Sequence, residues 1–276
     1  MNKGLDLSNY KLDIVVVAGQ SNAQGNGQGS PELIYKGNKK AFELTTLHPV
    51  GYIAIKGSDG SFIYPFIHMA KDDYVYQPLN EDYHDERYNG GFYLSFADEY
   101  CKKYLKEDRH LLIVKAGSGG TGFSDGMWQK GGEPFERMME MIDMALSLNK
   151  ENKIVGFLWH QGECDIAWGK PADWYEKELV NLFNIVREKY GKFPMLAGDF
   201  SPDWALSSEN LPFTSKYNTM FKELENKYEL YKFVSSENLE SNAKAMKSDD
   251  AIHFSRKGQF EFGLRYFDKY TKVRKQ

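Results

Sequence analysis

The stretch LDIVVVAGQSN, residues 12–22, joins a short apolar run to a polar turn that contains a glycine. A run of this length is typical of a β-strand that is covered on both faces, as in a parallel sheet. Four later runs have the same form, and each is followed by a polar or glycine-rich loop: residues 111–116, 154–159, 193–197 and 231–235. We therefore expect these five runs to be strands of one sheet.

Helical patterns lie between the predicted strands. Residues 93–106, 134–148 and 173–189 repeat apolar side chains at the 3.6-residue spacing of a helix with one buried face. Strand, loop and helix in alternation are typical of a doubly wound α/β sheet. The sequence therefore predicts a flavodoxin-like, three-layer α/β/α sandwich around a mainly parallel sheet.

Residues 26–92 break this alternation. They are rich in Gly, Pro, Asp and Tyr and have no sustained period, so we expect a long insertion at the rim of the domain, with a few short strands, one of them near residues 52–56. The chain has no internal repeat, low-complexity tract or linker. Residues 1–276 are therefore predicted to form a single domain.

The composition excludes several classes of protein. Apolar residues make up 41% and charged residues 27% of the 276, which argues against a disordered chain. The net charge of −4 argues against nucleic acid or an anionic membrane as the partner. Cys101 and Cys164 form neither a disulfide framework nor a zinc motif, so we expect no metal. The first residues lack an apolar signal segment, which predicts a cytoplasmic protein, or a secreted one if a leader has been removed.

Ser21 lies just beyond the glycine of the turn that follows the first predicted strand. Open α/β sheets bind ligands at the carboxyl ends of their strands, so this turn is a candidate site. A serine here can expose its hydroxyl and offer its own N–H to an anion. The alternative is that Ser21 only caps the next helix. GQSN is not the GxSxG nucleophile motif, so the turn alone does not decide between the two.

Asp250 and His253 form a DxxH pair beyond the last predicted strand. At this spacing the carboxylate can hold the Nδ1–H of the imidazole, which leaves Nε2 free to face a serine elsewhere in the chain. The pair alone is a weak signal because it often arises by chance. Together with Ser21 and two further polar loops at strand ends, it favours a hydrolytic site.

Those two loops carry groups that acyl transfer requires. The run GSGGTG, residues 117–122, leaves backbone N–H groups unobstructed, as an oxyanion hole needs. A phosphate-binding or purely structural turn is the alternative, but no GK[ST] or GxGxxG motif is present. The run WHQGECD, residues 159–165, places the Gln161 amide where it can donate to an oxyanion. Glu163 fits a hydrogen-bonding role better than that of a base, and Cys164 is a second possible nucleophile.

The sequence resembles the SGNH/GDSL hydrolase superfamily, and within it the carbohydrate esterases of the acetylxylan esterase and sialate O-acetylesterase type. The resemblance rests on blocks that occur in the family's order and span most of the chain: VVVAGQSNAQG, GGFYLSFA, GSGGTGF with the tryptophan at 128, GFLWHQGECD and DDAIHFSRKGQFEFGLRYF. Two positions depart from the usual pattern. Cys164 replaces a serine, and AQGNGQG follows the Ser21 turn in place of the commoner MAGRG.

The resemblance implies a serine esterase that needs no cofactor and acts on an acetylated carbohydrate. It implies that Ser21 is the nucleophile, that His253 is the general base and acid, and that Asp250 orients the imidazole. The oxyanion hole would consist of the Ser21 N–H, an N–H of the glycine pair, for which we choose Gly120, and the Gln161 side chain.

We expect four side chains to contact the substrate: Gln20, Asn22, Trp128 and Glu163. Trp128 and Trp168 can form walls for a sugar, or can simply pack in the core. Two other functions stay open. The same triad can act on another acyl group, as in a lipase or thioesterase, and the fold can serve as a binding module without activity. The sequence carries no signal for oligomeric state.

Overall fold

The computed structural model describes residues 4–29, 35–46, 51–52, 55–56, 62–63, 66–67, 74–84 and 87–274. Its centre is a seven-stranded sheet with the strand order β13-β12-β11-β1-β10-β2-β7. The strands are β1 (Lys11–Gly19), β2 (Ala41–Thr46), β7 (Tyr74–Pro78), β10 (Arg109–Lys115), β11 (Lys153–His160), β12 (Met195–Gly198) and β13 (Tyr231–Val234). All neighbours in this sheet are parallel except β2 and β7, which are antiparallel.

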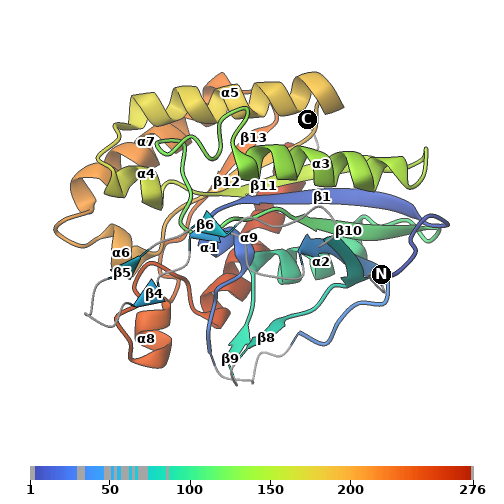
Figure 1. Ribbon diagram of the computed structural model, residues 1–276, viewed down its shortest axis with the longest axis horizontal. Coiled ribbons are helices and arrows are strands. Elements are labelled where there is room, and N and C mark those ends of the chain that lie inside the picture. The colour runs from blue at the N-terminus through green and yellow to red at the C-terminus, as the bar shows by residue number, and fades with distance from the viewer. Residues whose placement is uncertain are drawn as a thin grey trace.

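Helices cover both faces of the sheet, as Figure 1 shows. The longer ones are α2 (Phe92–Lys103), α3 (Glu133–Ser147), α5 (Ala172–Tyr190), α7 (Leu211–Lys227) and α9 (Arg256–Val273). Short helices follow three of the strands or precede α9: α1 (Ser21–Gln24), α4 (Glu163–Ala167), α6 (Pro202–Ala205) and α8 (Asn242–Met246). The predicted three-layer α/β/α sandwich with a mainly parallel sheet is confirmed.

The side chains of β1 alternate between the two faces of the sheet and so pack into two separate hydrophobic cores. Ile14, Val16 and Ala18 pack into the core that includes residues of α3, α5 and α7. Val15 and Val17 pack into the core that includes residues of α2 and α9. Because both faces are covered, β1 is apolar along most of its length, which is why a continuous apolar run predicted it correctly.

The region 26–92 is more than a rim insertion. It supplies β2 and β7 to the main sheet, and β2 pairs with β10. The sequence analysis missed β2 because a charged residue interrupts its apolar pattern. Glu43 is buried there, and its carboxylate lies 3.3 Å from the ammonium of Lys115 on β10.

The rest of this region forms three small antiparallel pairs. They are β3 (Gly51–Tyr52) with β6 (Phe66–Ile67), β4 (Ile55–Lys56) with β5 (Phe62–Ile63), and β8 (Asp82–His84) with β9 (Arg87–Asn89). The predicted strand near residues 52–56 corresponds to β3 and β4, and residues 53–54 between them lie outside the described residues.

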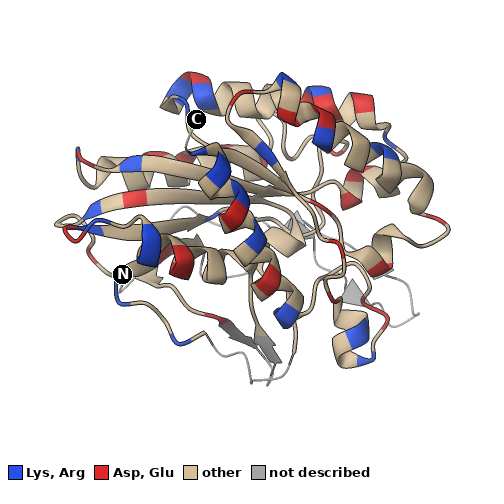
Figure 2. Ribbon diagram, turned by 180° about the vertical axis from the view of Figure 1, so that it is seen from behind, with Lys and Arg blue, Asp and Glu red and all other residues tan. Residues whose placement is uncertain are grey.

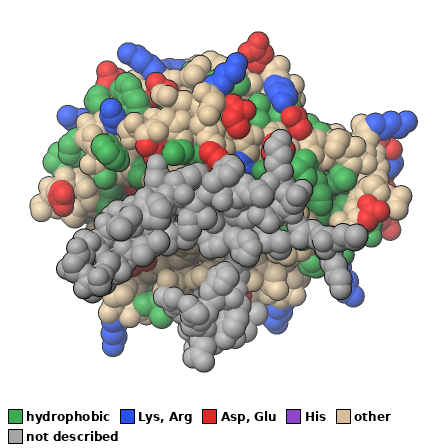
Figure 3. All heavy atoms as spheres, viewed as in Figure 1, with side chains coloured by type: hydrophobic (Ala, Val, Ile, Leu, Met, Phe, Trp, Pro, Cys, Tyr) green, Lys and Arg blue, Asp and Glu red, His purple; other side chains and the backbone are tan. Residues whose placement is uncertain are grey.

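The surface carries charges of both signs. On the face seen in Figure 2, Lys and Arg alternate with Asp and Glu along the helices and strand ends. On the opposite face, apolar side chains lie in small groups among charged and polar ones (Figure 3). In the described part of the chain, no helix is both long enough and apolar enough to cross a bilayer.

Candidate active site

The turn after β1 exposes Ser21 through a glycine that no other residue can replace without strain. Gly19 has φ of +127°, and a Cβ at this position would lie 2.0 Å from the carbonyl oxygen of His160. The Gln20 N–H donates to that same oxygen over 2.9 Å, which holds the turn against the end of β11. Ser21 is then the first residue of α1 and not its N-cap, which is Gln20.

Ser21, His253 and Asp250 form a continuous hydrogen-bonded series. The Ser21 Oγ lies 2.7 Å from Nε2 of His253, and Nδ1 of the same ring lies 2.8 and 2.9 Å from the two oxygens of Asp250. An ionised carboxylate only accepts, so Nδ1 carries the proton and Nε2 is free to accept from the serine hydroxyl. The structure therefore brings together the three predicted triad residues, which are separated by up to 232 positions in the chain.

The turn between Asp250 and His253 holds the carboxylate in its ionised form. Burial by itself would raise the pKa of Asp250, but hydrogen bonds from the His253 ring and from Asn242, together with the His253 charge, lower it below 3.8. The His253 N–H also donates to Asp250 Oδ1 over 3.2 Å. The carboxylate is thus available to orient the imidazole at neutral pH.

The backbone around Ser21 offers donors for an oxyanion. The Ser21 N–H has no acceptor among the described residues, as is usual in the first turn of a helix. Gly119 lies next to it, because a Cβ built on Gly119 would be 4.0 Å from the Ser21 Cβ. Gly120, the predicted donor, is exposed, and its carbonyl accepts from the Cys164 thiol over 2.9 Å. The glycine pair thus lies beside Ser21 and Cys164.

The Gln161 side chain, predicted to complete the oxyanion hole, is bonded to other groups of the protein in this structure. Gln161 is fully buried, and its amide nitrogen donates to Asp165 Oδ2 over 2.8 Å. The same nitrogen has longer contacts, of 3.3 Å to the Thr121 carbonyl and 3.4 Å to Gln20 Oε1. Gln161 as an oxyanion donor stays a prediction.

The structure buries all four side chains that were predicted to contact the substrate. Gln20, Asn22, Trp128 and Glu163 have exposed fractions of 3%, 0%, 0% and 1%. Trp128 packs edge-on against Trp159 and donates its indole N–H to Thr121 Oγ1 over 2.8 Å. Gln20 Oε1 accepts from the Cys164 N–H over 3.2 Å. These side chains lie beneath the surface of the site and support its floor.

Asn242 belongs to the site, although the sequence analysis did not find it. Its Nδ2 donates to Asp250 Oδ2 over 2.9 Å and to the Asn26 carbonyl over 3.0 Å. Its backbone N–H donates to the His253 carbonyl over 2.8 Å. No local pattern marks an asparagine at the start of a five-residue helix as a partner of a residue eight positions later, so only the folded chain reveals it.

Cys164, the second candidate nucleophile, is held as a neutral thiol. Burial, followed by the nearby charges of Asp125, Asp165 and Glu163, raises its pKa to about 12. Only a thiolate is a strong nucleophile, so Cys164 is unreactive at neutral pH. Burial likewise raises the pKa of Cys101 to about 12.

We therefore expect Cys164→Ser to keep kcat within about twofold of the wild type, because a serine hydroxyl can still donate to the Gly120 carbonyl. Iodoacetamide at pH 8 is expected to label neither thiol of the folded protein and both thiols of the unfolded protein, as measured by intact mass. Rapid labelling of native Cys164 with loss of esterase activity would contradict this assignment.

No group of three or more His, Cys, Asp or Glu side chains that could hold a metal ion occurs in the part of the chain that is described.

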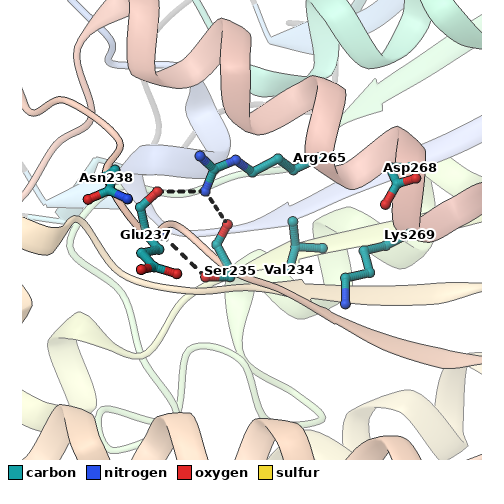
Figure 4. Close-up of a pocket in the computed structure, with 7 residues that line it drawn as sticks. All are labelled: Val234, Ser235, Glu237, Asn238, Arg265, Asp268 and Lys269. Atoms are coloured by element: carbon teal, nitrogen blue, oxygen red, sulfur yellow. Dashed lines mark hydrogen bonds between the residues drawn. The ribbon is translucent and has the colours of Figure 1, made fainter.

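A pocket lies at the outer edge of the sheet, between the end of β13 and α9 (Figure 4). Arg265 crosses it and donates to the carbonyls of Ser235 and Glu237. None of the triad residues lines this pocket, and it is not part of the candidate site.

Comparisons with known proteins show the family and the fold of the chain. The model of a family described as a carbohydrate esterase, sialic acid-specific acetylesterase, matches residues 11–272. The chain is similar in structure to NanS, with a TM-score of 0.71 and 17% identity, over 97% of this chain and 99% of that one. It is also similar to a protein from Arabidopsis thaliana, with a TM-score of 0.65 and 17% identity, over 95% of this chain and 98% of that one. No curated protein matches the sequence.

Proposed function

Because the chain belongs to the sialic acid-specific acetylesterase family of carbohydrate esterases, we propose that it hydrolyses O-acetyl esters of sialic acid-type sugars with Ser21, His253 and Asp250 as its catalytic triad. The observation that carries the proposal is the hydrogen-bonded series from Ser21 Oγ through the His253 ring to Asp250. The family makes the protein an ester hydrolase, and the triad supplies a mechanism for that activity.

In the first half of the reaction, Ser21 Oγ attacks the carbonyl carbon of the acetyl group. A serine hydroxyl is too weakly acidic to attack unaided, so Nε2 of His253 removes its proton as the new C–O bond forms. Asp250 stabilises the resulting imidazolium and keeps Nδ1 protonated. The tetrahedral intermediate then collapses, His253 returns the proton to the departing sugar oxygen, and an acetyl–Ser21 ester remains.

In the second half, a water molecule takes the place of the sugar. His253 removes a proton from this water as it attacks the acetyl carbon, and the ester bond to Ser21 breaks with return of the proton to Oγ. The products are acetate and the free enzyme. In both halves the negative charge on the former carbonyl oxygen is met by the Ser21 N–H and by backbone of the loop at Gly119. Loss of one such donor typically lowers kcat by about 10²–10³.

A panel of acetylated substrates tests the proposal. O-acetylated sialic acid, acetylated xylan, a xylo-oligosaccharide acetate and 4-nitrophenyl esters of two and eight carbons are compared by acid release. We expect the highest kcat/KM on acetylated sialic acid among the carbohydrates. A higher kcat/KM on acetylated xylan would show that xylan, and not sialic acid, is the preferred sugar. A preference for the eight-carbon ester would show that the substrates are lipid esters.

Trp168 is the one predicted sugar wall that is exposed. Its exposed fraction is 70%, and it follows α4 at the carboxyl edge of the sheet. The backbone N–H of Trp168 donates to the Cys164 carbonyl, and the Cys164 thiol donates to the Gly120 carbonyl. Trp168 therefore lies close to the glycine loop of the site. An exposed indole beside a carbohydrate site is suited to stack on a sugar ring.

We expect Trp168→Ala to raise KM for the acetylated sugar by about 2- to 12-fold, which corresponds to about 0.5–1.5 kcal/mol of aromatic contact. Steady-state kinetics on the sugar ester and on 4-nitrophenyl acetate would measure this. Since the aryl acetate has no sugar to stack, its kcat/KM should not change, and Trp168→Phe should restore most of the affinity. Equal effects on both substrates would contradict a sugar platform.

A further inference from the structure

The backbone on both sides of His253 is held by the side chain of one buried residue, Asn22. Its Nδ2 donates to the carbonyl of Ile252 over 3.0 Å, and its Oδ1 accepts from the N–H of Phe254 over 3.1 Å. Asn22 also follows Ser21 directly in the chain. One amide therefore joins the nucleophile's own helix to the residues before and after the general base.

The orientation of this amide is fixed by two further partners. Glu163 Oε1 accepts from Asn22 Nδ2 over 2.9 Å, and Gln259 Nε2 lies 3.3 Å from Asn22 Oδ1. A carboxylate accepts and an NH₂ group donates, so both contacts demand that the Asn22 nitrogen face Glu163 and its oxygen face Gln259. If the amide were reversed, each of its four contacts would place a donor against a donor or an acceptor against an acceptor.

Glu163 is itself anchored within the protein interior. It is 1% exposed, and its Oε1 lies 3.5 Å from Nδ1 of His160, whose exposed fraction is 0%. The other nitrogen of that ring, Nε2, lies 2.9 Å from the carbonyl of Asp199 and must donate to it. The carboxylate is thus buried beside the His160 ring, and its Oε1 is bonded to the amide of Asn22.

We propose that Asn22 and Glu163 are positioning residues, which set the distance between Ser21 Oγ and His253 Nε2 without touching the substrate. The proposal rests on the proposed function, since it assigns Ser21 and His253 their catalytic roles. Asn22 fixes the turn that carries the imidazole, and Glu163 fixes Asn22. A displacement of about 1 Å between reacting groups can cost about 10²-fold in rate, so the effect should be large although neither residue reacts.

The test uses two pairs of variants of the full chain and separates turnover from binding. Asn22→Ala is expected to lower kcat by about 10²-fold with KM within about twofold of the wild type. Glu163→Met, which cannot accept from Asn22, should lower kcat about 10-fold or more. Glu163→Gln keeps an acceptor oxygen for Asn22 Nδ2 and should therefore retain most of the wild-type kcat.

A phosphonate that labels the active serine provides a second readout, because its rate reports the reactivity of Ser21 independently of the sugar. The labelling rate should fall in parallel with kcat in Asn22→Ala and Glu163→Met, and recover in Glu163→Gln. Normal kcat and labelling in folded Asn22→Ala would overturn the proposal. If that variant does not fold, equal rates for Glu163→Met and Glu163→Gln would overturn it. Failure of the proposed function would appear differently, as a wild-type protein that releases no acetate.

Discussion

Ser21→Ala is expected to lower kcat for acetyl ester hydrolysis by on the order of 10⁵–10⁶ and to leave the fold unchanged. The hydroxyl removed is the atom that would form the acyl-enzyme, and among the described residues no other nucleophile is hydrogen-bonded to His253 Nε2. Cys164 cannot replace it, because burial raises the pKa of that thiol to about 12. Ser21 is 7% exposed, and loss of one oxygen at the site surface leaves no cavity in either core.

Acetate release from the sugar ester and from 4-nitrophenyl acetate measures the loss, and circular dichroism checks the fold. Ser118→Ala is the matched control. Ser118 lies in the neighbouring glycine loop, and its buried Oγ has no hydrogen-bond partner among the described residues, so its removal should change little. Turnover of Ser21→Ala near that of the wild type would end the assignment of Ser21 as the nucleophile.

The sheet could be predicted wherever local pattern and burial agree. The five predicted runs correspond to β1, β10, β11, β12 and β13, because strands covered on both faces are apolar along their length. The pattern fails at β2, where Glu43 sits inside the strand. Its charge is tolerated because Lys115 on the neighbouring strand pairs with it, and that partner lies 72 positions away in the chain.

Most residues of the candidate site could be predicted, but Asn242 and the directions of several side chains could not. Ser21 and Asn22 are adjacent in the sequence, and a helix turns about 100° between successive residues, so one faces the site and the other the interior. Trp128 follows a loop as a sugar platform would, yet its indole bonds Thr121 of the same loop and packs on Trp159. Whether a polar side chain lines a pocket or supports its floor depends on contacts between distant segments, which a single sequence does not specify.

The proposed roles of Ser21 and His253 predict that the effects of their substitutions depend on each other. His253→Ala should lower kcat by a factor similar to that of Ser21→Ala, because the hydroxyl is inert without a base to take its proton. The double variant should then be little worse than either single one, since residues that act in one step lose their effect together. His110→Gln, at the opposite end of β10 from the glycine loop, is the matched control and should keep the wild-type rate.

The pH profile of the wild type adds a test that does not require a variant. The pKa of Asp250 is lowered below 3.8, so its carboxylate stays ionised throughout the neutral range and cannot account for a loss of activity there. The rate should nevertheless fall as the pH is lowered, because a protonated imidazole cannot take the proton of the Ser21 hydroxyl. A rate that stays flat from pH 5 to 9, with chemistry limiting, would contradict His253 as the base. Losses of the two single variants that multiply in the double variant would show that Ser21 and His253 do not share a step.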